Sequence, residues 1–492
     1  MKVRTRTAPS PTGYLHVGNA WSAFFNWLLT RNQRGVFVLR VEDTDRSRST
    51  EEFETSVLED FKWLGIDWDE GPDVGGGYGP YRQTERMHLY RQYADELRTR
   101  RAAYHCYCTP EELDAERKQA EAAGGAYRYS GRCRDLSESQ RAAFLAEGRV
   151  PTVRMRIDPG PPIVVDDLVQ GRVEFGPEHL DDFIIVRSNG TPLYNFANVV
   201  DDHLMAITHI VRGSEHLNNT PRQLLIYQAL GWTPPQVAHL PVILGTDRKK
   251  LSKRHGDTAV RDYRRAGYLP EALRNFFALM AWYPEEDREI YSMQELIQKF
   301  RIQDVNNVSP TFDVAKLTWM NGVYMRDLIA RDPDRVVTLC QDVLNDAGLL
   351  DGRVTPETRT YIARVIDVLG DRIKIGRDIL AYGDFFFTDG VTYEPDAVKK
   401  YFSRKDVAAT LGQLRDRIAR AGPFEAGAVE TIVREMATDL GLQTGEIIHP
   451  VRVALTGKTA GPGLFELMAL LGRDRVVQRL DSAIDWIRSA TS

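Results

Sequence analysis

The sequence predicts an α/β domain that is split by an inserted α+β module and followed by an all-α region. Across the first two-thirds of the chain, short β-branched runs alternate with amphipathic windows, which is typical of a parallel sheet with helical crossovers. Between about residues 100 and 190, cysteine-bearing loops, two short polar helices and a proline-rich strand region replace this alternation and indicate an insertion. After about residue 320, strand signals nearly vanish and apolar residues recur with a helical period.

Length and composition agree with a multidomain globular protein. A chain of 492 residues corresponds to about three or four domains, and its 42% hydrophobic and 27% charged residues exclude wholesale disorder and collagen-like repetition. No run approaches the ~18 apolar residues of a membrane span. Four cysteines are too few for a disulfide framework, so we expect a cytoplasmic protein. The net charge of -5 excludes a histone-like protein but permits a local basic face that binds nucleic acid.

The β-branched runs predict four buried strands, at residues 36–42, 183–187, 206–212 and 239–244. The C-terminal helices are recognised by their apolar faces, and one of them begins after Thr355, with a proline at its first helical position. The faces of that helix and of the last helix comprise Ile362, Val365, Ile366 and Leu369, and Val476, Val477, Leu480, Ile484 and Ile487.

The N-terminus combines a short strand, a Pro/Gly turn and a helix with His16, Gly18 and Asn19 at its entrance. Unpaired backbone N–H groups and the dipole attract phosphate to such a helix start. Gly18 would let a ligand approach the backbone, and His16 could donate a hydrogen bond to a phosphate oxygen. A structural histidine at the start of its helix is the alternative interpretation. The buried stripe of this helix is predicted to be Trp21, Phe24, Phe25, Leu28 and Leu29.

A lysine-rich loop, LGTDRKKLSKRHGD, follows the strand predicted at residues 239–244. It holds Lys249, Lys250 and Lys253 in a chain that is otherwise poor in lysine. A cationic cluster on a loop suits a polyphosphate, whose negative charge grows as it leaves. A solvated charge run without a ligand is the alternative.

Three of the four cysteines, Cys106, Cys108 and Cys133, stand just before two capping-box sequences, so we expect all three on loops at helix entrances. In a cytosolic protein, such a cluster indicates zinc. Reduced, metal-free cysteines are the alternative. The fourth cysteine, Cys340, lies in a helical window and is expected in the core.

Together, the His-x-Gly-Asn and Lys-Leu-Ser-Lys-Arg sequences, about 230 residues apart, are similar to the paired signatures of class I aminoacyl-tRNA synthetases. Asn19 and Arg254 depart from the generic class I motifs, and both changes are usual in the subfamily that the chain resembles. That subfamily is the bacterial-type glutamyl-tRNA synthetases, and the resemblance covers essentially the whole chain. It rests on the segments APSPTGYLHVGN, RVEDTDR, GPYRQTER, YNFANVVDDH, VRGSEHLNNTPRQ, KKLSKRHG, FDVAKLTWMNGVYMR and HPVRVALTGKTAGPGLFELMALLG.

The resemblance implies a Rossmann-type catalytic domain that is split by an acceptor-stem-binding insertion. The implied division is a first catalytic half at 1–100, the insertion with a zinc site at 101–190, and a second catalytic half with the lysine loop at 191–256. A stem-contact domain at 257–325 and a helical anticodon-binding region at 326–492 complete it.

Residues at strand ends suit the binding of an amino acid. Arg6, Glu42 and Arg212 each end a predicted strand, and ligands of open parallel sheets bind beyond those ends. A guanidinium can hold a carboxylate bidentately, and a carboxylate can hold an ammonium. The resemblance implies that Arg212 binds the side-chain carboxylate of glutamate and Glu42 its α-ammonium. Structural salt bridges are the alternative for each residue alone. The glutamate-binding positions that the resemblance implies are Arg6, Ala8, Ser10, Glu42, Tyr194, Asn198 and Arg212.

The resemblance also implies the reaction and its partners: ATP, Mg²⁺, L-glutamate and tRNA(Glu). Glutamate is activated to glutamyl-adenylate and transferred to the terminal adenosine 2′-OH, and bound tRNA is required for activation. Catalysis is then positioning and charge neutralisation, in which His16 and Gly18 hold ATP phosphates and Lys250 and Lys253, with Mg²⁺, stabilise the departing pyrophosphate. The implied ATP-binding positions are Pro9, Ser10, Thr12, Gly13, His16, Gly18, Asn19, Leu251, Ser252, Lys253 and Arg254.

The fourth zinc ligand and the range of tRNAs each have more than one interpretation. Tyr129 gives the Y-x3-C pattern of some relatives, whereas Asp135 holds the C-x-H position of others, so either could be the fourth zinc ligand. Whether tRNA(Gln) is also charged depends on how the helical region contacts the last anticodon base; Arg372 lies near the expected place. The family implies a monomer.

Three alternatives compete with a glutamyl-tRNA synthetase. A glutamyl-queuosine tRNA enzyme lacks the helical anticodon region, and a glutaminyl-tRNA synthetase has a β-barrel in its place, so the helical C-terminus argues against both. A non-catalytic tRNA-binding paralogue is the third, and the intact His16, Gly18, Lys250 and Lys253 argue against it.

Overall fold

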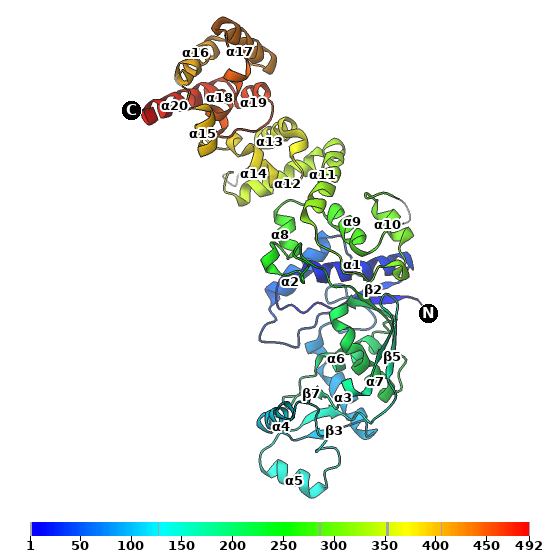
Figure 1. Ribbon diagram of the computed structural model, residues 1–492. Helices are drawn as coiled ribbons and strands as arrows, with labels where there is room; N and C mark the ends of the chain where they lie inside the picture. Colours follow the sequence, from blue (N-terminus) through cyan, green and yellow to red (C-terminus); the bar gives the residue numbers. More distant parts are fainter. Residues whose placement is uncertain (1, 126, 285–286, 351–353, 405, 492) are drawn as a thin grey trace. The chain divides into compact units, whose positions relative to one another are not determined.

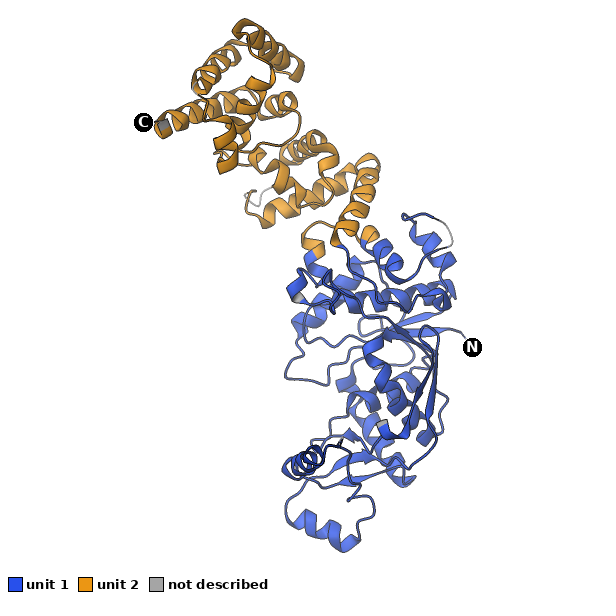
Figure 2. Cartoon of the chain, in the orientation of Figure 1, with its two compact units in different colours: residues 1–262, 273–313 blue, residues 263–272, 314–492 orange. Residues whose placement is uncertain are grey.

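The structure, a computed structural model, describes residues 2–125, 127–284, 287–350, 354–404 and 406–491, without the side chains of His179, Lys253 and Thr491. The chain forms two compact units (Figure 2). One comprises residues 1–262 and 273–313, and the other comprises residues 263–272 and 314–492.

The first unit is α/β and the second is helical (Figure 1). The strands are β1 Arg4–Thr7, β2 Val36–Leu39, β3 Ala103–Cys106, β4 Thr152–Met155, β5 Ile163–Asp167, β6 Gly171–Phe175, β7 Ile184–Val186, β8 His209–Gly213 and β9 Gln236–Leu240. Helices α1 to α10 are Val17–Asn32, Glu51–Trp63, Met87–Thr99, Pro110–Ala122, Glu138–Ala146, Tyr194–Leu204, Thr220–Leu230, Val260–Arg265, Pro270–Ala281 and Met293–Lys299. Helices α11 to α20 are Val314–Arg331, Pro333–Asp346, Pro356–Leu369, Asp378–Gly383, Pro395–Tyr401, Val407–Arg420, Ala426–Leu440, Gly445–Thr456, Leu464–Leu471 and Arg473–Thr491.

Parallel strand pairing gathers the ends of several strands at one edge. β1 pairs in parallel with β2, and β8 with β9, where Arg212 lies opposite His239. The Thr208 N–H donates to the Arg4 carbonyl at 2.9 Å and so joins the start of β8 to β1. β5 pairs in parallel with β9 and antiparallel with β6, whereas β3, β4 and β7 form a separate antiparallel sheet. Arg6, near the end of β1, and Arg212, near the end of β8, line the same cavity.

The predicted α/β part with an all-α region behind it is confirmed, and so are its main helices. The whole predicted stripe of α1 is buried, and Trp21 Nε1 donates to the Phe277 carbonyl at 2.9 Å. α13 starts after Thr355, whose side chain accepts from the Thr358 N–H, and its predicted face is buried. Cys340 is buried in the core of the helical unit, as predicted.

Several predicted strand bounds were wrong, for local reasons. The strand predicted at 206–212 begins at His209, because Ala206 has a φ of 54°, outside the extended region. The strand predicted at 239–244 runs instead over Gln236–Leu240, since Pro241 has no N–H to continue the ladder. Cys106 was expected on a loop but ends β3, where it pairs with Thr152 of β4.

Among the described residues, no helix has the length and apolar character that a membrane crossing requires.

Candidate active site

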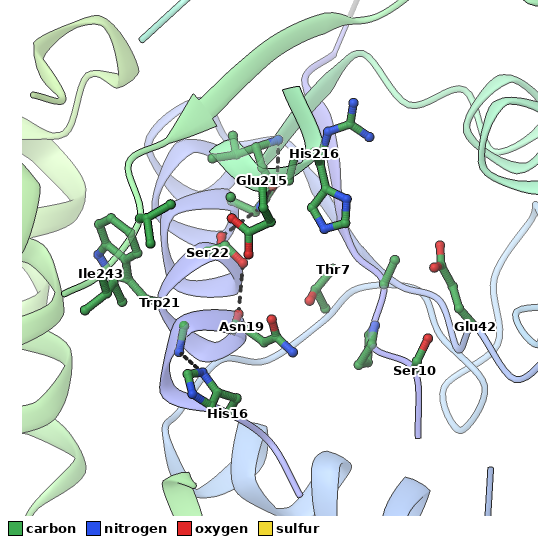
Figure 3. Close-up of a pocket in the computed structure, with 18 of the residues that line it drawn as sticks. Thr7, Ser10, His16, Asn19, Trp21, Ser22, Glu42, Glu215, His216 and Ile243 are labelled. Carbon is green, nitrogen blue, oxygen red and sulfur yellow. Dashed lines mark hydrogen bonds between the residues drawn. The ribbon is translucent and has the colours of Figure 1, made fainter. Parts of the chain in front are cut away.

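A cavity of about 590 Å³ opens where the carboxyl ends of β1 and β8 meet the N-terminus of α1 (Figure 3). All seven positions predicted to bind glutamate line it. Of the positions predicted to bind ATP, Gly13, Ser252 and Arg254 do not line it, and the Lys253 side chain lies outside the described residues. Those that line it are Pro9, Ser10, Thr12, His16, Gly18, Asn19 and Leu251, together with the predicted catalytic Lys250.

His16 caps α1 and also faces the cavity (Figure 3). Its Nδ1 accepts the Gly18 N–H at 3.0 Å, so in the neutral ring the proton sits on Nε2. Burial and the charge of Lys250 lower the pKa of His16, against an opposing effect of Glu215, which favours this neutral form. His16 can therefore cap α1 through Nδ1 and still donate a hydrogen bond to a ligand through Nε2.

Behind the cavity, two buried arginines share one buried carboxylate. Arg6 Nε donates to Asp202 at 3.0 Å, and Arg40 Nη1 donates to the same carboxylate at 2.7 Å. Burial alone would raise the pKa of Asp202, but the two guanidinium groups outweigh it and hold that pKa below its usual value. Asp202 therefore stays ionised and fixes the orientation of Arg6.

Glu42 lies on the opposite side of the cavity from α1 (Figure 3). Its carboxylate accepts from Asn198 Nδ2 at 2.7 Å and from Arg40 Nη2 at 3.2 Å. Burial raises the pKa of Glu42, while Arg40 and Arg6 oppose the rise. A cationic ligand group in the cavity would favour its ionised form further.

Arg212 is buried, with only 6% of its surface exposed, yet its partners in the protein are neutral. Its Nη2 donates to Thr220 Oγ1 and to Gln223 Oε1, each at 2.8 Å, and its Nη1 donates to Tyr194 Oη at 3.4 Å. Among the described residues, no carboxylate forms an ion pair with it. Burial lowers the pKa of Arg212, because removing a charge from water is costly. The site therefore offers a fixed positive charge to an anionic ligand.

The lysine loop contributes a further cationic group to the cavity, in addition to Arg6 and Arg212. Lys250 lines it, and its Nζ lies 3.8 Å from Glu215, which follows β8. Lys249, one residue earlier, is exposed and is not among the residues that line the cavity.

Sequence reasoning missed two groups of residues around the cavity. Glu215 and His216 line it and belong to a motif that was quoted but given no role. Asp202 and Arg40 act from behind it. They lie in the quoted segments YNFANVVDDH and RVEDTDR, but a sequence does not show which buried charges meet.

The three predicted zinc-ligand cysteines come together. The Sγ atoms of Cys106, Cys108 and Cys133 all lie within 4.8 Å of one another. Tyr129 Oη lies 3.3 Å from the Sγ atoms of both Cys106 and Cys108. Asp135 is not part of this cluster: its side chain is 80% exposed and pairs with Arg156 at 3.2 Å.

Comparison with known proteins agrees with this geometry. Residues 2–319 match the family of class I tRNA synthetases (E and Q), catalytic domain, and residues 335–484 match an anticodon binding domain. The α/β unit is therefore the catalytic domain of a class I tRNA synthetase.

Relatives that match nearly the whole chain identify one family within this class. The chain is 47% identical to a glutamate–tRNA ligase of Moorella thermoacetica, with 99% of each chain covered, and 46% identical to one of Symbiobacterium thermophilum, with 98% and 99% covered. A crystal structure of a glutamate tRNA ligase from Elizabethkingia meningosepticum, in complex with its amino acid, matches with a TM-score of 0.82 and 33% identity over 99% of both chains. The chain belongs to the glutamate–tRNA ligase family.

Proposed function

We propose that this chain activates L-glutamate with MgATP and transfers it to the 3′-terminal adenosine of tRNA(Glu). The observation that carries this proposal is Arg212, a buried cation with neutral partners at the end of β8. Such a group favours a ligand with a carboxylate on its side chain, because a carboxamide of the same shape leaves the charge uncompensated.

The other end of the amino acid would be held by Glu42 and Arg6. Glu42 lines the cavity and supplies a carboxylate for the α-ammonium. Arg6, oriented by Asp202 and Asn198, would bind the α-carboxylate. Tyr194 and Asn198, on α6, complete this part of the cavity.

The first chemical step needs no protein nucleophile. An oxygen of the glutamate α-carboxylate attacks the α-phosphorus of ATP, the bond to the bridging oxygen breaks, and pyrophosphate leaves. We expect His16 Nε2–H and the N-terminus of α1 to bind the phosphates, and Lys250 to stabilise the charge that grows on the leaving pyrophosphate, because these groups line the cavity. In the second step the ribose 2′-OH attacks the acyl carbon and gives up its proton to the departing phosphate oxygen or to water, the bond from that carbon to the phosphate oxygen breaks, and AMP leaves. Mg²⁺ enters with ATP as part of the substrate.

The direct test is ATP–pyrophosphate exchange and tRNA charging by the full chain. Exchange should depend on glutamate in the presence of tRNA, and tRNA(Glu) should be charged. A parallel assay with tRNA(Gln) decides whether that tRNA is also a substrate. Tight tRNA binding without exchange or charging would instead identify a non-catalytic paralogue.

Lys250→Ala should lower the exchange rate by about 10²-fold or more while the KM for ATP changes little, because the lysine acts on charge that develops as pyrophosphate leaves. Lys249→Ala is the matched control, one residue away and exposed, and should change the rate by less than about 3-fold. Lys253→Ala is expected to behave like Lys250→Ala. Equal effects of Lys250→Ala and Lys249→Ala would remove the specific role of Lys250.

A structural zinc ion fits the cysteine cluster. In tetrahedral coordination with Zn–S distances of about 2.3 Å, sulfurs lie about 3.8 Å apart. Cys108 and Cys133 Sγ are 3.6 Å apart, and Tyr129 Oη is close enough to two of the sulfurs to complete the set. Zinc would cross-link β3 to the turn around Cys133 and so stabilise the insertion that is predicted to contact the acceptor stem. We propose Tyr129, rather than Asp135, as the fourth ligand.

Tyr129→Phe should weaken zinc binding by at least about 10-fold, measured by competition with a chromophoric chelator on purified protein. Asp135→Asn is the matched control and should bind zinc like the unaltered chain, because Asp135 pairs with Arg156 away from the sulfurs. The opposite ranking would assign the fourth ligand to Asp135. Undetectable zinc binding by the unaltered chain would remove the metal from this account.

Three further proposals rest on what membership of the family implies. We infer that the helical region at 326–492 binds the anticodon, that the chain acts as a monomer, and that it works in the cytoplasm, where its four free thiols are stable. The five-part domain division also stays a prediction.

A further inference from the structure

The guanidinium of Arg212 is held from behind by a buried imidazole. Arg212 Nε donates to His239 Nε2 at 3.0 Å, and the two residues lie directly opposite each other on β8 and β9. Because Nε2 must accept this hydrogen bond, the ring of His239 must carry its proton on Nδ1. Any other protonation state would place an N–H against an N–H.

Asp167 fixes that tautomer. It ends β5, the strand next to β9, and its Oδ2 lies 2.5 Å from His239 Nδ1. Its Oδ1 accepts the backbone N–H groups of Val169, Gln170 and His239, so the carboxylate is held in one orientation. Both side chains are buried. Burial lowers the pKa of His239, with the charge of Arg212 acting in the same direction and Asp167 opposing, so the ring stays neutral.

The arrangement orients Arg212 without neutralising it. A carboxylate in direct contact with the guanidinium would compensate its charge and weaken its attraction for an anionic ligand. Inserting a neutral imidazole supplies the required acceptor and keeps the carboxylate one ring further away, where its effect on Arg212 is weaker. Thr220 and Gln223 hold the other side of the guanidinium with neutral oxygens in the same way.

We propose that Asp167 and His239 are positioning residues for Arg212 that set the preference of the pocket for an anionic amino-acid side chain. The proposal rests on the proposed function. It also assigns a role to β5, which lies in the segment predicted as the tRNA-binding insertion, because that strand delivers Asp167.

The most informative variant is Asp167→Asn. The asparagine oxygen can still accept the three backbone N–H groups, but its NH2 group faces His239 Nδ1 and favours the other tautomer. The ring then presents Nε2–H to the Nε–H of Arg212, and a buried donor is left unpaired. We expect the KM for glutamate to rise about 10- to 100-fold in ATP–pyrophosphate exchange with tRNA present, while the KM for ATP stays near that of the unaltered chain and the protein remains folded at the assay temperature.

Asp166→Asn is the matched control, because Asp166 is the preceding residue of β5 and its side chain is exposed. It should leave the KM for glutamate unchanged. A second variant, His239→Gln, replaces the ring with an amide whose oxygen can accept from Arg212 and whose NH2 can donate to Asp167. It should keep most of the glutamate affinity.

A double-mutant cycle separates tautomer control from a structural role. In a His239→Leu background, which has no ring to transmit the change from residue 167 to Arg212, Asp167→Asn should raise the KM for glutamate by less than about 3-fold further. An equal effect of Asp167→Asn in both backgrounds, or an unchanged KM for glutamate in the single variant, would overturn the proposal and leave the proposed function intact. Failure of the unaltered chain to use glutamate at all would overturn the proposed function, and this inference with it.

Discussion

The pocket depends on how buried arginines share carboxylates. Asp202 bridges Arg6 and Arg40, and Arg40 also donates to Glu42, so the positive and negative charges behind the cavity compensate one another. Arg212 stands apart from this sharing, because hydroxyl, amide and imidazole groups hold it. A fixed charge in a buried site is worth far more than the same charge in water and needs no reorganisation when the ligand arrives. The positive end of the pocket is therefore prepared before any substrate binds.

The fold makes this arrangement possible by joining residues that are distant in sequence. The ends of β1 and β8 supply Arg6 and Arg212, the segment after β2 supplies Glu42, and the start of α1 supplies His16. Parallel pairing sets their directions, and the buried aromatic stripe of α1 holds the helix start against this edge. The helical unit has a hydrophobic core of its own, as a separate recognition domain would need.

Much of this could be predicted from the sequence, for identifiable reasons. The period of the apolar residues marked α1 and α13, and the predicted strand-end residues Arg6, Glu42 and Arg212 do line one cavity. The predicted strand bounds were wrong near Ala206 and Pro241, because backbone geometry there overrides the β-branched pattern. The partners of buried charges could not be predicted, because residue types do not show which side chains meet. The roles of Asp202 and His239, and the choice between Tyr129 and Asp135, needed tertiary contacts.

The central claim is that the uncompensated charge of Arg212 selects the side chain of the amino acid. The most direct measurement is kcat/KM for glutamate and for glutamine in ATP–pyrophosphate exchange, with tRNA present, for the unaltered chain and for Arg212→Gln. The unaltered chain should prefer glutamate by at least about 10³-fold, because a carboxamide leaves a buried charge without a partner. Arg212→Gln should remain folded, and it should lose most of that preference because its kcat/KM for glutamate falls. A similar preference in both proteins, or comparable use of glutamate and glutamine by the unaltered chain, would contradict the account.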